Sequence, residues 1–214
     1  MIKQRLTPKL FQAICALLFS IMAGQAAAAT VFHVNVDTSS LAGTTGYLDI
    51  QFNPGQALAP AASADLSGFS GDAVLLSGAT LDGGASGSLP GTLHFYNTTT
   101  FNALLQPVNF GNAFSFDAAF SGNFLTSGGN IGTTFSLALL DASNATLKSI
   151  DIDGRLLRFE LAPGGQVTPS TYASDNMGGQ PLATVAAVPL PGTLMLLLSG
   201  MSMLGYTFRR RQSL

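Results

Sequence analysis

Three acidic residues have the spacing of a calcium loop. Asp151 and Asp153 stand two residues apart before Gly154, and Glu160 follows six residues after that glycine. Calcium prefers oxygen ligands, and its binding loops place carboxylates at comparable intervals around a glycine. Arg155 occupies the position of a third ligand, so we favour a hairpin turn with exposed acids over a metal site. We expect no cofactor, and a calcium ion bound here would stabilise the fold rather than catalyse a reaction.

Two histidines are the candidate general bases of the chain. His33 and His94 both fall at solvent-facing positions of predicted strands. No G-x-S-x-G sequence is present to place a serine nucleophile on a sharp turn. The motifs of zinc proteases, P-loop nucleotide binding and dinucleotide binding are also absent. We therefore expect a protein that is not an enzyme, and a secreted hydrolase is the less favoured alternative.

The aromatic residues favour a core over a sugar-binding stripe. The sequence has 15 Phe, four Tyr and no Trp. Sugar platforms usually use Trp or Tyr, whose rings stack while a polar edge stays hydrated. A carbohydrate- or calcium-binding module is nevertheless the alternative function, and in that case Tyr47 or Tyr96 would contact the saccharide.

Strands must position all of these residues, because the body of the chain alternates apolar and polar residues with a period of two. This alternation, with one face buried and one solvated, is typical of antiparallel sheets. The apolar positions of the clearest strands are Phe32, Val34, Val36, Leu48, Ile50, Phe52, Phe114, Phe116, Phe120, Phe135, Leu137, Leu157 and Phe159.

Glycine-rich breaks separate these segments and predict tight turns, since glycine supplies the positive φ that such turns need. We expect an all-β domain over residues 30–168, an antiparallel β-sandwich of seven to nine strands that is jelly-roll-like. A single sheet or a β-solenoid is the alternative. Residues 169–187 are small, polar and rich in Pro and Gly, which predicts a linker.

Charge is distributed in three blocks. Residues 30–188 carry three basic and eleven acidic residues, a net charge of −8, and the other six basic residues lie in the two terminal segments. This scarcity of Lys and Arg excludes a nucleic-acid-binding surface. The single cysteine, Cys15, excludes a disulfide framework within the chain.

The N-terminal segment, residues 1–29, has the three parts of a secretory signal peptide. Basic residues precede an apolar run, and Ala27 and Ala29 satisfy the A-x-A rule for signal peptidase. We expect cleavage after Ala29, with Ala26 as the alternative site. The apolar run is short for an uncleaved membrane anchor, which is the other interpretation.

The C-terminal segment, residues 188–214, combines a proline motif, an apolar span and an arginine cluster. Residues 192–208 contain no charge and are long enough for a short transmembrane helix. The basic cluster that follows predicts a cytoplasmic stop, which leaves the acidic body outside the inner membrane. The motif consists of Val188, Pro189, Leu190, Pro191 and Gly192, and the cluster of Arg209, Arg210 and Arg211.

This tripartite end resembles a PEP-CTERM sorting signal in its V-P-L-P variant, with Leu190 in place of the central Glu. The resemblance covers about the last 27 residues. It implies a Gram-negative bacterium that secretes exopolysaccharide, and an exosortase-type membrane enzyme that removes the anchor near Pro189–Pro191. We therefore expect an exported, non-enzymatic protein, anchored in the inner membrane as a precursor. After processing it would reach the outer surface or the extracellular matrix, in association with exopolysaccharide or biofilm.

Overall fold

The structure, a computed structural model, describes residues 30–175, 177 and 179–188. The predicted signal peptide with Ala27 and Ala29, the motif residues from Pro189 onward, the apolar span 192–208 and the terminal arginines lie outside these residues. Within the described ranges, no helix has the length and apolar character needed to cross a membrane.

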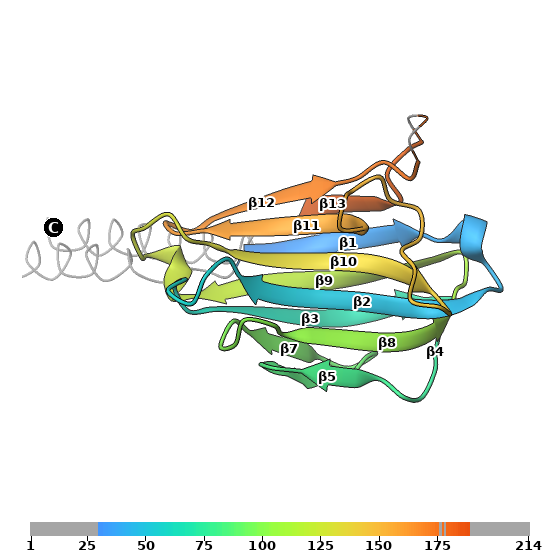
Figure 1. The fold of residues 1–214 in the computed structure, drawn as a ribbon, viewed down its shortest axis with the longest axis horizontal. Helices are drawn as coiled ribbons and strands as arrows, with labels where there is room; N and C mark the ends of the chain where they lie inside the picture. The colour runs from blue at the N-terminus through green and yellow to red at the C-terminus, as the bar shows by residue number, and fades with distance from the viewer. Residues whose placement is uncertain (1–29, 176, 178, 189–214) are drawn as a thin grey trace, which may run out of the picture.

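Two antiparallel sheets make up the fold (Figure 1). The first, which we call sheet A, has six strands in the order β13 (Ala183–Ala187), β1 (Thr30–Asp37), β9 (Ala113–Gly122), β3 (Ala62–Gly71), β7 (Leu93–Tyr96) and β6 (Ala85–Gly87).

The second, sheet B, has seven strands. Six follow in the order β12 (Gln166–Thr171), β11 (Arg155–Ala162), β10 (Thr133–Asp141), β2 (Thr45–Pro54), β8 (Ala103–Asn109) and β4 (Val74–Leu75), and β5 (Thr80–Asp82) also pairs with β8. Two short 3-10 helices, η1 (Ser39–Leu41) and η2 (Asn123–Leu125), complete the described elements.

The core lies between the sheets, where the alternating apolar residues meet. Phe120 of β9 contacts Phe135 of β10 and Phe159 of β11, with ring centroids 5.7 and 5.0 Å away. All three side chains are fully buried. Because aromatic pairs at such distances contribute beyond their buried area, this cluster joins the two sheets. The structure confirms the predicted all-β class, the two antiparallel sheets and the buried strand faces.

The C-terminal part of the domain differs from the prediction of a linker at residues 169–187. β12 continues to Thr171, and β13 pairs with β1 from Phe32 opposite Ala187 to Val36 opposite Ala183. Pro169 lies in β12, an edge strand, where a residue without an N–H group is tolerated. The sandwich therefore extends to Ala187. Small residues concealed these strands because they carry little apolar alternation.

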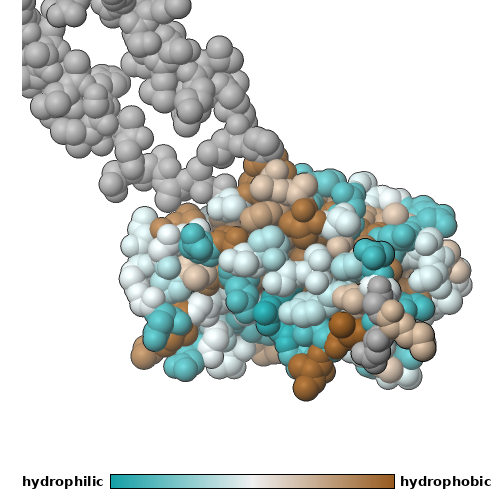
Figure 2. All heavy atoms as spheres, turned by 90° about the horizontal axis from the view of Figure 1, so that it is seen from above, coloured by the Kyte–Doolittle hydropathy of each residue, from teal (hydrophilic) through white to brown (hydrophobic). Residues whose placement is uncertain are grey.

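The strand count also exceeds the expected seven to nine, because β4, β5 and β6 have only two or three residues each. Such short strands at the far side of both sheets expose few unpaired backbone groups, which limits pairing with other chains. In the view of Figure 2, hydrophilic and near-neutral residues cover most of the described surface, and hydrophobic ones form small separate groups.

Candidate functional site

The two ends of the described domain lie on neighbouring strands. β1 begins at Thr30, immediately after the predicted signal cleavage site, and β13 ends at Ala187. The backbone N–H of Val188 donates to the carbonyl of Val31 at 2.8 Å, so the pairing continues to the first residue of the predicted sorting motif. The folded domain thus reaches the motif without an intervening linker.

The acids of the predicted calcium loop face arginines instead of one another. Asp151 accepts a hydrogen bond from Nε of Arg155 at 2.9 Å, and Asp153 forms an ion pair with the same guanidinium. Glu160 lies on β11 and pairs with Arg158 at 3.2 Å. Among the described residues, no three His, Cys, Asp or Glu side chains gather as a metal site would require.

A turn produces the arrangement around Arg155. The N–H of Gly154 donates to the carbonyl of Asp151 at 2.9 Å, and Gly154 has a φ of +73°. A Cβ at this position would also collide with Thr146. Glycine is therefore needed here, and the turn directs Arg155 to both preceding carboxylates. This matches the favoured interpretation of a turn, although the Asp151 side chain is mostly buried rather than exposed.

Both histidines lie on the outer face of sheet A, as predicted, but neither stands alone. Nδ1 of His33 on β1 is 2.6 Å from Oδ1 of Asp117 on β9. Nδ1 of His94 on β7 is 2.7 Å from Oδ1 of Asp65 on β3. Each pair joins two directly opposed residues of adjacent strands. The histidines therefore act as cross-strand partners of aspartates in the described structure.

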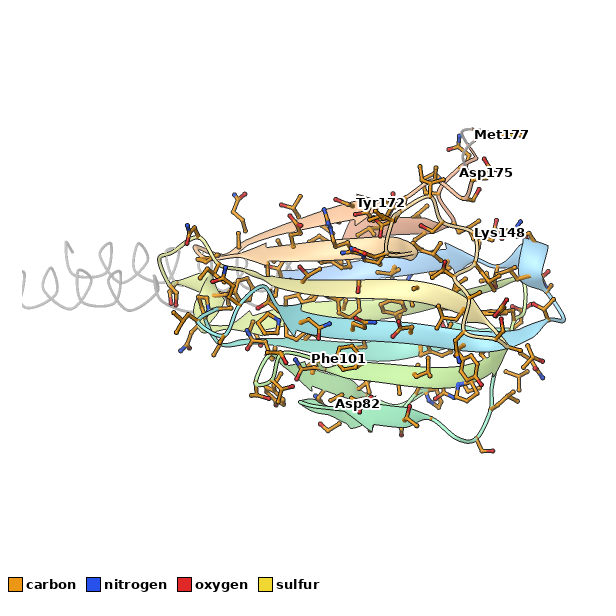
Figure 3. All side chains as sticks on the ribbon, viewed as in Figure 1. Asp82, Phe101, Lys148, Tyr172, Asp175 and Met177 are labelled. Atoms are coloured by element: carbon orange, nitrogen blue, oxygen red, sulfur yellow. The ribbon has the colours of Figure 1, made fainter. Side chains whose placement is uncertain are left out.

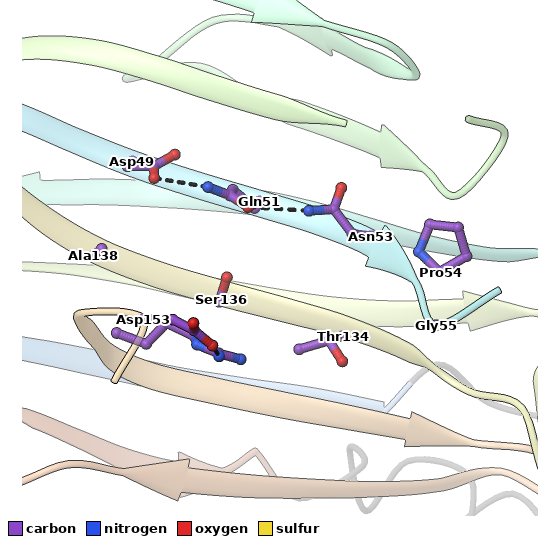
Figure 4. Close-up of a pocket in the computed structure, with 10 residues that line it drawn as sticks. Asp49, Gln51, Asn53, Pro54, Gly55, Thr134, Ser136, Ala138 and Asp153 are labelled. Carbon is purple, nitrogen blue, oxygen red and sulfur yellow. Dashed lines mark hydrogen bonds and ion pairs between the residues drawn. The ribbon is translucent and has the colours of Figure 1, made fainter. Parts of the chain in front are cut away.

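A hollow with a volume of about 390 Å³ lies on the outer face of sheet B (Figure 4). We call it the β2–β10 groove. Its lining residues come from β2, β10 and the start of β11: Asp49, Gln51, Asn53, Pro54, Gly55, Thr134, Ser136, Ala138, Asp153 and Arg155.

Strand β2 supplies a row of linked polar side chains along the groove. Asn53 donates its amide to Gln51 at 3.0 Å, and Gln51 donates to Asp49 at 2.8 Å (Figure 4). The three residues alternate with buried apolar residues, so they all project from one face. The groove floor thus has hydrogen-bonding groups at regular intervals, ending at a carboxylate.

Asp49 has an apolar setting at the end of this row. Its cross-strand neighbours are Ala138 on β10 and Leu105 on β8. Burial raises the pKa of the Asp49 carboxyl above its ordinary value, and the hydrogen bond from Gln51 offsets only part of that effect. The charged form of Asp49 is therefore less stable than that of an exposed aspartate.

Strand β10 contributes two hydroxyl groups, from Thr134 and Ser136, opposite Asn53 and Gln51. Neither hydroxyl bonds to a side chain elsewhere in the described part of the chain. Arg158 lies opposite Ser136 on the other side, and its Nε is buried without a hydrogen-bond partner among the described residues. The Thr134 and Ser136 hydroxyls are therefore the groove groups that the described domain leaves unused.

Aromatic rings flank this face. Tyr47 precedes Asp49 by two residues on β2, so it projects to the same side, half-buried. Tyr172, labelled in Figure 3, follows β12 and lies with its ring centre 6.0 Å from the Arg158 guanidinium carbon. Tyr96, the other tyrosine considered for sugar binding, lies on the outer face of sheet A and is half exposed.

Sequence reasoning placed Leu48, Ile50 and Phe52 on the buried face of β2, but it did not identify the groove on the opposite face. The missing information was the pairing of β2 with β10, about 80 residues away in the chain, which places Ser136 opposite Gln51. A polar serine and threonine within the apolar alternation of residues 133–139 was the available signal.

Comparison with known proteins gives one result, at the C-terminal end. The family model for the PEP-CTERM protein-sorting motif matches residues 187–211. No curated protein and no solved structure matches the chain. The match begins at Ala187, the last residue of β13, and it implies an exported protein with an exosortase-type processing partner. The chain carries a PEP-CTERM protein-sorting motif, which begins at the end of the last strand that the structure describes.

Proposed function

We propose that this chain is a non-enzymatic protein of the cell surface or extracellular matrix of a Gram-negative bacterium, associated with exopolysaccharide. The observation that carries the proposal is the sorting motif at residues 187–211, placed next to an exported, acidic β-sandwich. Signal peptidase would remove residues 1–29. The apolar span 192–208 and Arg209–Arg211 would then hold the precursor in the inner membrane until the exosortase-type enzyme acts.

The position of β13 supports processing at the proline motif. Because β13 is paired with β1 up to Val188, the enzyme would meet Pro189–Pro191 at the edge of a finished domain. Cleavage there would leave all strands of the sandwich in place. The released product would then be the folded domain itself.

The setting of the histidines supports a binding or structural role over hydrolysis. A hydrolytic histidine needs a nucleophile within hydrogen-bond reach of one ring nitrogen and an orienting group at the other. His33 and His94 have the orienting aspartates, but their nearest described partners on the sheet are those aspartates alone. If the hydrolase alternative holds, His33→Ala or His94→Ala will abolish a measurable hydrolysis of polysaccharide or ester substrates.

Replacing Pro189 and Pro191 by Ala tests the sorting pathway. We expect the double variant to accumulate in the inner membrane as a precursor that retains Arg209–Arg211, detected by fractionation and intact-mass spectrometry. The wild-type protein should end near the proline motif. Pro163→Ala, in the turn between β11 and β12, is the matched control and should be processed normally. Release of the double variant at the wild-type rate would overturn the proposal.

A further inference from the structure

We infer that the β2–β10 groove is a binding site for an uncharged polysaccharide. The inference rests on the proposed function for the presence of polysaccharide where the protein acts. The site itself is argued from the groove residues, whose side chains offer a carboxylate, amides and hydroxyls on one open face.

The chemistry of the groove suits sugar hydroxyls. A hydroxyl group both donates and accepts, so it needs partners of both kinds within a short distance. Asp49 accepts only, Gln51 has an N–H beyond those used along β2, and the Thr134 and Ser136 hydroxyls can do either.

The shape suits an extended chain rather than an enclosed small molecule. Outward residues on one strand recur roughly every 6.8 Å, which gives Asp49, Gln51 and Asn53 the arrangement of a linear track. The hollow of about 390 Å³ lies open along β2 and β10 (Figure 4). Tyr47, beyond the Asp49 end of the row, presents a ring that could cover one sugar face.

Charge selects against an acidic polysaccharide. The domain carries a net charge of −8 over residues 30–188, and a polyanion is repelled by such a field. The one arginine that lines the groove, Arg155, is already engaged by Asp151 and Asp153. A neutral, hydroxyl-rich chain meets neither obstacle.

Binding by the full chain, purified in mild detergent from a host without the sorting enzyme, tests the site independently of processing. The probes are dextran, galactomannan and xylan as uncharged polysaccharides, and alginate as a polyanion, in affinity electrophoresis. We expect retardation by at least one uncharged probe and none by alginate. The variant Thr134→Val/Ser136→Ala removes two hydroxyls with little change in shape. It should weaken binding about tenfold or more.

The matched control is Ser63→Ala/Ser115→Ala, which removes two hydroxyls from the outer face of sheet A and should bind like wild type. Circular dichroism of both variants checks that the fold is intact. Equal binding by wild type and Thr134→Val/Ser136→Ala, retardation by alginate alone, or no retardation by any probe would overturn the inference. None of these results affects the sorting proposal, which fails only if the proline motif is not processed.

Discussion

The outer faces of the two sheets use similar polar residues in opposite ways. On sheet A, hydrogen bonds run across strands, from His33 to Asp117 and from Ser63 to Ser121 at 2.8 Å. In the β2–β10 groove of sheet B, they run along one strand, from Asn53 through Gln51 to Asp49. Cross-strand bonds satisfy both partners and tie neighbouring strands together. Bonds along β2 leave the facing hydroxyls of β10 unengaged.

This difference shows how a sandwich of low charge can have one closed and one open face. On sheet A, polar side chains of neighbouring strands form hydrogen-bonded pairs, including Ser70 with Ser115 at 3.0 Å. Sheet B concentrates polar groups over a hollow, where a ligand could engage them. Composition alone does not separate the two faces, since both carry Ser, Asp and amide or imidazole side chains.

The largest expected loss of stability comes from a substitution in the core between the two sheets. Phe135→Ala deletes a fully buried ring that contacts Phe120 of sheet A and Phe159 of sheet B. We expect a loss of about 3–5 kcal/mol in the free energy of unfolding, measured by urea denaturation. Ser136→Ala, the next residue on the same strand but facing outward, should change stability by about 0.5 kcal/mol or less. Equal losses in the two variants would contradict the sandwich register.

A double-mutant cycle sharpens the description of sheet A as the closed face. His33→Ala and Asp117→Ala should show a coupling of about 0.2–1 kcal/mol in unfolding free energy, the range for cross-strand pairs. The control cycle joins His33 to Asp65, which instead bonds His94, and should show no coupling within error. Coupling in the control but not in the first cycle would show that the pairs are wrongly assigned.

The smallest expected effect concerns the open face. Because burial raises the pKa of Asp49, its carboxylate destabilises the folded state once it ionises. The folded state binds the proton more tightly than the unfolded chain, so stability falls as pH rises from the unfolded pKa through the folded one. Asp49→Asn retains the acceptor for Gln51 and should raise the free energy of unfolding by about 0.5 kcal/mol at neutral pH.

The measurement is thermal unfolding of both proteins at several pH values. The two curves should converge below about pH 3.9, where Asp49 is protonated in both states. A variant that is less stable than wild type at neutral pH would show that the charge of Asp49 is favoured in the groove.

Much of the fold could be predicted from alternation, and much of the candidate site could not. The buried face of β9 could be predicted because large apolar residues stand at every second or fourth position, namely Phe114, Phe116 and Phe120. β13 escaped prediction because its inward positions, Ala183 and Val185, are small or partly exposed, so its place depends on pairing with β1.

The groove depends on the pairing of β2 with β10, which no local sequence pattern reveals. Ser136 and Gln51 become neighbours only through the pairing of two strands distant in sequence. The acidic loop shows the reverse case, because the favoured turn at Gly154 is present and Arg155, which stands at a ligand position of the calcium-loop pattern, pairs with Asp151 and Asp153. Local charge patterns could therefore be interpreted, and long-range pairing could not.

The bond between Val188 and Val31 also has a mechanical consequence. Antiparallel strands that are pulled apart from adjacent ends break their hydrogen bonds one after another, whereas strands pulled from opposite ends must break them together. Thr30 and Val188 are such adjacent ends. Tension between the two flanking segments would open β13 from β1 like a zipper, at low force. Cleavage of either flanking segment ends that tension, so one cleavage is enough to keep β13 paired with β1.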